Sequence, residues 1–82
     1  MPIPERLTEL VEHLRAEGDG AEIGPLSTGE RCFVAIAAHR YGLLPPAYAD
    51  PIEAWFRLNE DWQLAACEWR DWPRSYARGT SR

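Results

Sequence analysis

The sequence has no lysine, only two cysteines, and no long run of apolar residues. A membrane span needs roughly 20 consecutive apolar residues, so nothing in the chain predicts one. Two cysteines cannot build the disulfide framework of a small secreted domain. The first residues lack the basic start and the apolar stretch of a signal peptide. We therefore expect a cytoplasmic protein that does not enter a membrane.

The length and the charge exclude further classes of protein. A chain of 82 residues is too short for a two-domain enzyme, a Rossmann unit with a partner domain, or a barrel. The formal net charge is −4, from nine arginines against thirteen aspartates and glutamates. A mildly acidic chain is a poor generic binder of nucleic acid. Because 45% of the residues are hydrophobic, the chain is expected to fold as one small domain.

The motifs of catalysis and metal binding are also missing. The sequence has no glycine-rich phosphate loop, no Cys-x-x-Cys and no His-x-x-x-His, and no spacing marks a nucleophile and its base. Cys32 lies in an apolar segment, which predicts a thiol with a raised pKa, the opposite of an activated nucleophile. We expect two buried, reduced thiols, with a Cys32–Cys67 disulfide as the alternative. The sequence thus predicts no enzyme, no metal site and no cofactor.

Hydrophobic periodicity predicts a first helix from about Pro4 to Glu17. Its apolar residues recur at the i, i+3, i+4 and i+7 positions of one helical stripe. They are Leu7, Leu10, Val11 and Leu14. Residues 18–26 contain three glycines and one proline, and this composition predicts a loop.

A second helix is predicted over Ser27–Tyr41. Ser27 followed by Glu30 makes a capping box at its start. Residues 32–38 are apolar on every side, which is typical of a central, buried helix. Gly42 fits a glycine-terminated end, with Leu43 folding back as the accompanying hydrophobic contact.

The third periodic segment follows a proline-rich connector, residues 44–48, which we expect to be stiff and extended. Asp50 is a good N-cap, proline is favoured directly after it, and Glu53 completes a capping box. The segment runs to Trp72, where Pro73 stops it. Asn59 can cap or bend a helix, so residues 50–72 form either one helix or two.

The predicted fold is all-α, a compact single-domain bundle of three or four short helices. The helical domain covers residues 1–73, and residues 74–82 form an arginine-containing flexible tail.

Tryptophans recur every seven residues in the last segment. Trp55, Trp62 and Trp69 have this spacing, and a second series interleaves with them at residues 58, 65 and 72. In one continuous helix, all six residues line a single seam. The seam is then the core face, or in part a partner or dimer surface. The expected core residues are Leu7, Leu10, Val11, Leu14, Phe33, Ile36, Ala37, Ile52, Trp55, Phe56, Leu58, Trp62 and Trp69.

Rings and guanidinium groups alternate from residue 69 to residue 78. The predicted partner-binding residues are Trp69, Arg70, Trp72, Arg74, Tyr76 and Arg78, with Trp72 as the anchor. These residue types dominate protein–protein hot spots. Rings also stack on unpaired bases, which makes nucleic acid an alternative partner. A third interpretation is structural, with cation–π contacts that tie down the end of the helix.

Charge is unevenly distributed along the chain. Residues 1–30 carry two arginines and seven acidic residues, a balance of −5. Residues 74–82 carry three arginines and no acidic residue. Such a dipolar molecule can dock in one orientation against a partner with a complementary field.

The caps and core positions of residues 26–62 together resemble a pattern found in small accessory proteins of phages and prophages. The pattern comprises Leu26-Ser27-Thr28-Gly29-Glu30, Val34-Ala35-Ile36-Ala37-Ala38-His39-Arg40, Leu43-Leu44, Asp50-Pro51-Ile52-Glu53-Ala54, Arg57-Leu58 and Trp62. It contains no catalytic or ligand residues. The resemblance implies a small, acidic, helical protein of a mobile element. Some members of this class bind and disable a host defence complex, as anti-CRISPR proteins do, and others are regulators.

We therefore expect a non-enzymatic protein-binding module. The resemblance implies an inhibitor that blocks a host defence complex sterically. The alternatives are a nucleic-acid-associated regulator that uses the same residues, and a structural homodimer formed through the tryptophan seam.

Overall fold

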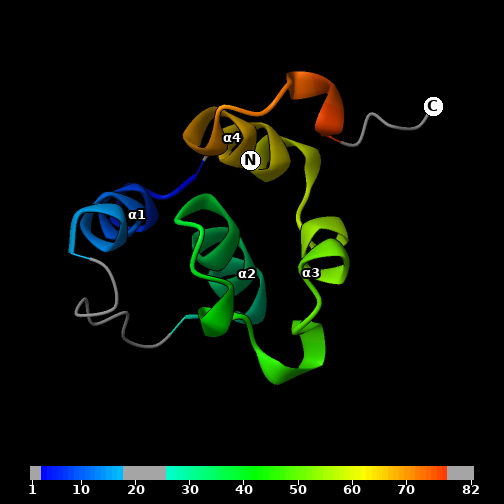
Figure 1. Cartoon of the computed structure of the whole chain (residues 1–82), viewed down its shortest axis with the longest axis horizontal. Coiled ribbons are helices and arrows are strands. Elements are labelled where there is room, and N and C mark those ends of the chain that lie inside the picture. Colours follow the sequence, from blue (N-terminus) through cyan, green and yellow to red (C-terminus); the bar gives the residue numbers. More distant parts are fainter. Residues whose placement is uncertain (1–2, 18–25, 78–82) are drawn as a thin grey trace.

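The computed structural model describes residues 3–17 and 26–77, and within them the chain is an all-α bundle (Figure 1). It contains α1 (Glu5–Glu17), α2 (Thr28–Ala37), α3 (Pro51–Arg57) and α4 (Glu60–Arg70). Three short 3₁₀ turns join or follow them, namely η2 (Tyr41–Leu43), η3 (Pro46–Tyr48) and η4 (Arg74–Tyr76). The predicted fold class is confirmed. None of the described helices combines the length and apolar character needed to cross a membrane.

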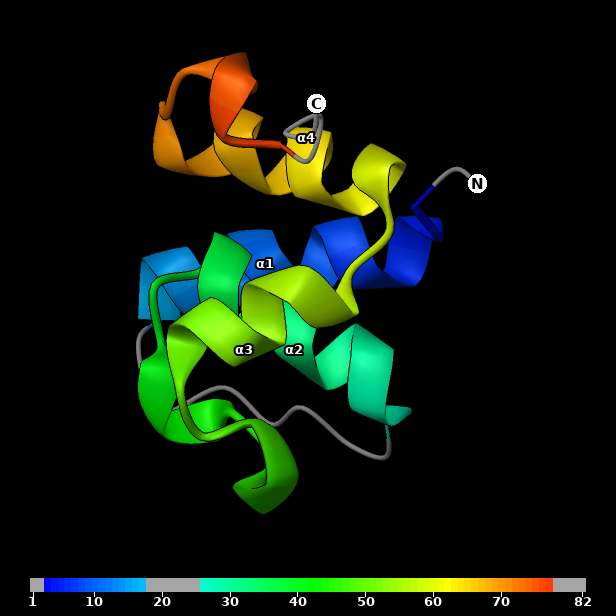
Figure 2. The same ribbon diagram turned by 90° about the vertical axis from the view of Figure 1, so that its right-hand side faces the viewer.

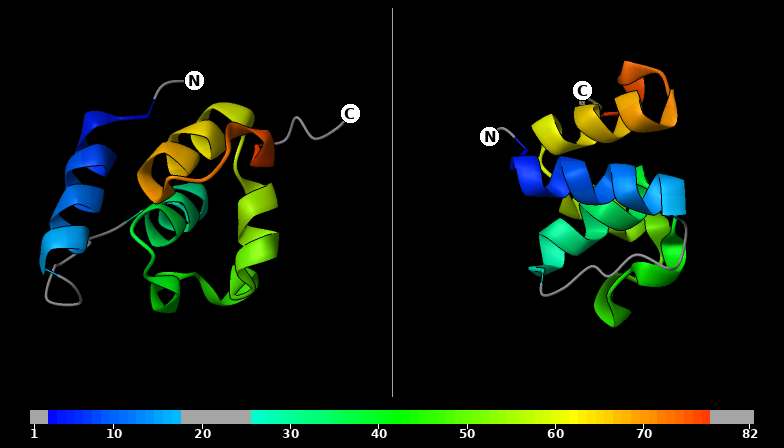
Figure 3. Two further views of the ribbon diagram at one scale, coloured as in Figure 1. Left: turned by 45° about the horizontal axis from the view of Figure 1, so that its top comes forward. Right: turned by 90° about the vertical axis from the view of Figure 1, so that its left-hand side faces the viewer.

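Helix α2 lies at the centre and contacts each of the other three helices. Helices α1 and α3 lie on opposite sides of it (Figure 3). Helix α4 crosses above the layer that α1, α2 and α3 form (Figure 2). The radius of gyration is 11.8 Å.

Helix α1 follows the predicted stripe. The carbonyl of Pro4 accepts the first hydrogen bonds of the helix, from the amides of Leu7 and Thr8. Leu7, Val11 and Leu14 are buried against α2, while Leu10 is partly buried at the edge of the core. The loop predicted for residues 18–26 falls outside the described residues except at residue 26.

The start of α2 is the predicted capping box. The hydroxyl of Ser27 accepts from the amide of Glu30 at 3.2 Å, and the Glu30 carboxylate accepts from the amide of Ser27 at 3.0 Å. Every residue from 32 to 38 is buried. A helix that is apolar all round has no face for water, and the fold accordingly places it in the centre.

Helix α2 ends at Ala37, four residues earlier than predicted. His39 adopts the left-handed conformation with φ of 59°. Its amide donates to the Ile36 carbonyl at 3.1 Å, and the Arg40 amide donates to the Ala35 carbonyl at 2.8 Å. This pair of bonds closes a helix end around one left-handed residue, usually glycine. Histidine supplies it here, so Gly42 is not the terminating residue and Tyr41–Leu43 forms a separate 3₁₀ turn.

The connector after α2 differs from the prediction, while Asp50 caps α3 as predicted. Pro45 is extended, but Pro46–Tyr48 forms a 3₁₀ turn, so the segment is not extended throughout. The Asp50 carboxylate then accepts from the amide of Ile52 at 2.9 Å, with Pro51 in the first helical position.

Residues 50–72 form two helices. Leu58 leaves the helical conformation, and the Asn59 side chain caps α4 by accepting from the amide of Trp62 at 2.9 Å. The buried Gln63 side chain donates to the carbonyl of Trp55 at 2.8 Å and ties the end of α3 to α4. Because of this break, the six-residue tryptophan seam does not form.

The break also changes which residues of α3 are buried. Ala54 and Leu58 face the core, and Trp55 packs partly against it. Ile52 and Phe56 were predicted to be core residues, but they are 65% and 67% exposed. These two residues are one turn apart, and a seven-residue helix that buries Ala54 must turn them outward.

Trp62 is the aromatic centre of the core. Its ring is 8% exposed and meets the buried ring of Phe33 edge-on, with 5.5 Å between the centroids. Trp62→Ala is expected to lower the free energy of unfolding by about 3–5 kcal/mol, as other buried aromatic truncations do. Phe56→Ala, at an exposed aromatic position, should change it by less than about 0.5 kcal/mol. Urea denaturation of both variants measures the difference, and equal losses would contradict the core described above.

Candidate binding groove

The chain after α4 turns back over the bundle. Asp71 takes the left-handed conformation with φ of 58°, and the amide of Trp72 donates to the Cys67 carbonyl at 2.9 Å. After Pro73, the η4 turn packs against α4, and Ala77 is buried. Residues 74–77 therefore belong to the folded domain, contrary to the expectation of a flexible tail from residue 74. The remainder of that tail lies outside the described residues.

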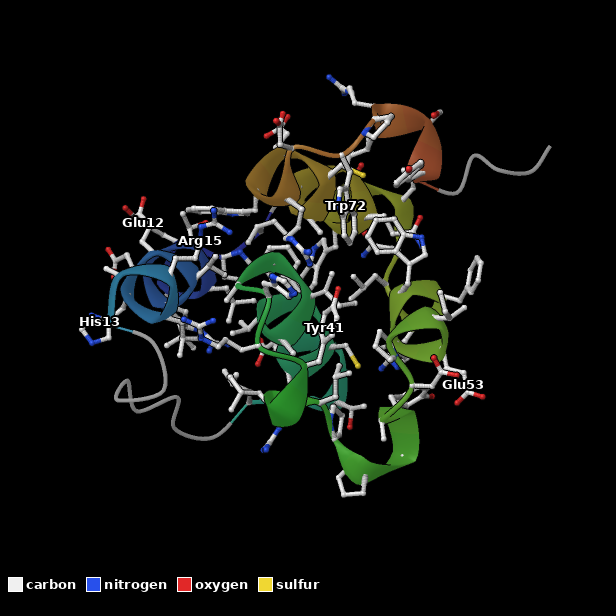
Figure 4. The ribbon with its side chains drawn as sticks, viewed as in Figure 1. Glu12, His13, Arg15, Tyr41, Glu53 and Trp72 are labelled. Carbon is white, nitrogen blue, oxygen red and sulfur yellow. The ribbon has the colours of Figure 1, made fainter. Side chains whose placement is uncertain are left out.

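This return places two rings over a groove of about 330 Å³. The wall residues come from α2, η2, α3, the segment after α4, and η4 (Figure 4). They are Ile36, Tyr41, Pro51, Ile52, Trp55, Trp72 and Tyr76. Each is apolar or aromatic, so the groove favours apolar guests.

The rings of the groove support one another. Trp55 and Trp72 meet edge-on with centroids 5.7 Å apart, and Tyr76 tilts against Trp72 at 5.9 Å. Trp55 and Trp72 are half-buried, whereas Tyr76 is 55% exposed. The groove thus has a fixed aromatic floor and a solvent-facing rim.

Arg70 lies against two of the residues that line the groove. Its guanidinium lies 4.4 Å from the centroid of the Trp72 ring and 5.8 Å from that of Tyr41. The Nη1 atom donates to the Ile36 carbonyl at 3.1 Å and to the Tyr41 hydroxyl at 3.0 Å. The cation therefore joins the end of α2 to the groove and holds two of its rings in place.

The six predicted binding residues do not form one continuous surface. Arg70, Trp72 and Tyr76 come together at the groove. Trp69 faces α1 instead, where the Arg15 guanidinium lies 5.6 Å from its ring centroid. Arg74 is exposed on η4, and Arg78 lies outside the described residues.

Sequence reasoning missed the other side of the groove. It placed Ile52 and Trp55 in the core, and it assigned Tyr41 to the end of a helix. The Asn59 cap was the signal that could have identified Ile52 and Trp55 as groove residues. If the helix breaks at Asn59, α3 and α4 need not bury the same face. The approach of Tyr41 to Trp72 depends on the fold and has no local signal.

Neither thiol is available at the surface. Cys32 and Cys67 are free and buried, so the alternative disulfide is not formed. Burial raises the pKa of both thiols, as predicted for Cys32. No group of three potential metal ligands occurs among the described residues. His13 and Glu12 project from different sides of α1, and both point away from the bundle (Figure 4).

Comparison with known proteins adds no family to this geometry. A scan against protein-family models, a search of curated proteins and a search of solved structures found no match to the chain. The function is accordingly argued from the groove and from the sequence pattern.

The two thiols provide a test of the core. In the native protein, their reaction with an aromatic disulfide reagent is expected to be slower than in denaturant by about a thousandfold or more, because it requires the core to open. Rapid labelling of Cys32 or Cys67 under native conditions would contradict their burial.

Because the pKa values of both thiols are raised on folding, the unfolded chain ionises its thiols at lower pH than the folded chain does. Stability should therefore fall as the pH rises past the ordinary range of a thiol.

Proposed function

We propose that this chain is a small, non-enzymatic protein-binding module whose binding surface is the groove between α3 and η4. The observation that carries the proposal is the clustering of exposed apolar side chains. Among the described residues, the exposed large ones are Tyr41, Ile52, Phe56 and Tyr76. Three of them line the groove, and Phe56 lies one turn beyond Ile52 on α3. Single exposed apolar residues are ordinary, but a contiguous set around a hollow is typical of a binding site.

The size and rigidity of the groove suit a protein partner. A volume of about 330 Å³ is at the small end for ligand pockets and has room for one or two large side chains. Trp72 is held by Trp55, Arg70 and Tyr76 before any partner arrives. A preorganised aromatic surface loses little side-chain entropy on binding, which supports affinity from a small contact area.

The target class comes from the resemblance of residues 26–62 to phage and prophage accessory proteins. It supports an inhibitor that occupies a surface of a host defence complex and blocks it sterically. The rigid groove would supply the anchor, and the acidic α1 side of the module would be free to repel or orient other components.

The two alternatives use the same residues in different ways. A nucleic-acid regulator needs a row of accessible ring faces along a basic strip. Trp69 faces α1 instead, and this weakens that alternative. A homodimer through the tryptophan seam needs one continuous helix, whereas Leu58 and Asn59 divide it in two.

Ile52→Glu tests the proposal directly, because it places a charge on the rim of the groove at an exposed helical position. Ala16→Glu is the matched control, because Ala16 is also exposed and lies on α1 at the other side of the molecule. Tagged wild type and both variants are used to capture proteins from a lysate of the source organism, and the captured protein is then purified and rebound. We expect Ile52→Glu to lower recovery by about tenfold or more, as loss of a hot spot does, and Ala16→Glu to leave it unchanged.

Three other outcomes would contradict this proposal. Equal recovery by all three proteins would place the binding surface elsewhere. Recovery that disappears with nuclease and falls steeply with salt would favour the nucleic-acid alternative. A concentration-dependent dimer in sedimentation, lost in Ile52→Glu, together with no captured protein, would favour a structural homodimer.

A further inference from the structure

A cation with no anionic partner among the described residues lies beside the groove. Arg70 is half-buried, and its Nη1 atom donates to the Ile36 carbonyl and to the Tyr41 hydroxyl. Among the described residues, its guanidinium forms no ion pair; the carboxylate that follows it in sequence, Asp71, is exposed. A guanidinium carries five N–H donors in one plane, more than the two bonds of Nη1 use. Because the group contacts Trp72 and Tyr41, which line the groove, a guest there lies close to a positive charge.

The position of Arg70 decides which guests fit. An aromatic pocket of this kind can hold a methylated ammonium ion against ring faces. Here the guanidinium already covers faces of Trp72 and Tyr41, at 4.4 and 5.8 Å from their centroids. A cationic guest would find those ring faces already occupied, and Arg70 would repel it. The charge complementarity of the site favours a carboxylate.

The ring geometry favours a protein segment over a nucleotide. Bases bind by stacking flat on an accessible ring face. Trp55 and Trp72 are inclined at 66° to each other, and Arg70 covers a face of Trp72. The lining also has an aliphatic part, from Ile36, Pro51 and Ile52, and it suits an apolar side chain better than a flat base.

We propose that the groove binds a segment of another protein in which a carboxylate lies beside a large apolar side chain. The apolar side chain lies in the groove against Trp55, Trp72 and Tyr76, and the carboxylate pairs with Arg70 beside it. A charge-assisted pair at a half-buried guanidinium is shorter and stronger than a neutral hydrogen bond, and it fixes the orientation of the segment. This inference rests on the proposed function, because it names the chemistry of the partner at the same groove.

Three small probes test the inference without knowledge of the partner. N-acetyl-tryptophan carries an indole and a carboxylate, N-acetyl-tryptophan amide is its neutral counterpart, and tryptamine carries an amine. Each is titrated into the labelled full chain while the indole N–H signals are followed by NMR. The signals of Trp55 and Trp72 should move, while that of Trp62 in the core stays in place. We expect the acid to bind about three- to tenfold more tightly than the amide, and tryptamine more weakly than both.

Arg70→Gln tests the role of the cation, because glutamine keeps an N–H donor for the Ile36 carbonyl and removes the charge. The variant should bind acid and amide equally. Arg74→Gln is the control, since it removes an exposed charge next to the groove, and it should keep most of the preference. If Arg70→Gln does not fold, the comparison of the three probes on the wild type still decides the sign of the preference.

The outcomes separate the two proposals. Equal binding of acid and amide, or a preference for tryptamine, would overturn the carboxylate inference and leave the groove as a binding site. A stronger response to thymidine monophosphate than to N-acetyl-tryptophan would overturn the assignment to a protein segment. No movement of the Trp55 and Trp72 signals with any probe at millimolar concentration would contradict the proposed function itself.

Discussion

The fold depends on satisfying the carbonyl groups at the buried C-terminal end of the central helix. The last turn of α2 leaves carbonyls that water cannot reach in the centre of the bundle. Two arginines donate to them from different helices: Arg15 of α1 to the Ala37 carbonyl at 3.3 Å, and Arg70 of α4 to the Ile36 carbonyl at 3.1 Å. The amide of the left-handed His39 also donates to the Ile36 carbonyl, and the amide of Arg40 donates to the Ala35 carbonyl. Guanidinium groups at a helix C-terminus also complement its dipole, so the same contacts orient α1 and α4 around α2.

Arg70 connects this structural constraint to the groove. The atom that donates to the Ile36 carbonyl also donates to the Tyr41 hydroxyl, and its plane covers the Trp72 ring. The residues that hold α4 on α2 therefore also hold the aromatic wall of the groove. A lysine at this position would supply a point charge but could not stack and donate in one plane. The aromatic wall of the groove thus shares its contacts with the core beneath it.

Local signals in the sequence predicted the features that depend only on neighbouring residues, such as helix caps and apolar segments. Ser27 and Asp50 cap their helices as expected, and the apolar body of the second helix is buried. Two helix ends could not be predicted, because His39 and Asp71 take a conformation that usually marks glycine. The groove combines residues from five separate segments, so no window of sequence contains it. Which face of α3 is exposed depends on the break before α4. Because the sequence does not decide whether residues 50–72 form one helix or two, it does not decide which face of α3 meets water either.

The most direct test of this account is equilibrium unfolding of Arg70→Met beside Arg74→Met. Methionine keeps an apolar stem against the rings and removes the donors and the charge. The account predicts that Arg70→Met loses about 1.5–3 kcal/mol of stability, the range for hydrogen bonds from a charged group, because the buried Ile36 carbonyl loses its charged donor and keeps the His39 amide. Arg74→Met, at an exposed position on η4, should lose less than about 0.5 kcal/mol. Equal stability of the two variants would contradict the claim that Arg70 joins α4 to the end of α2.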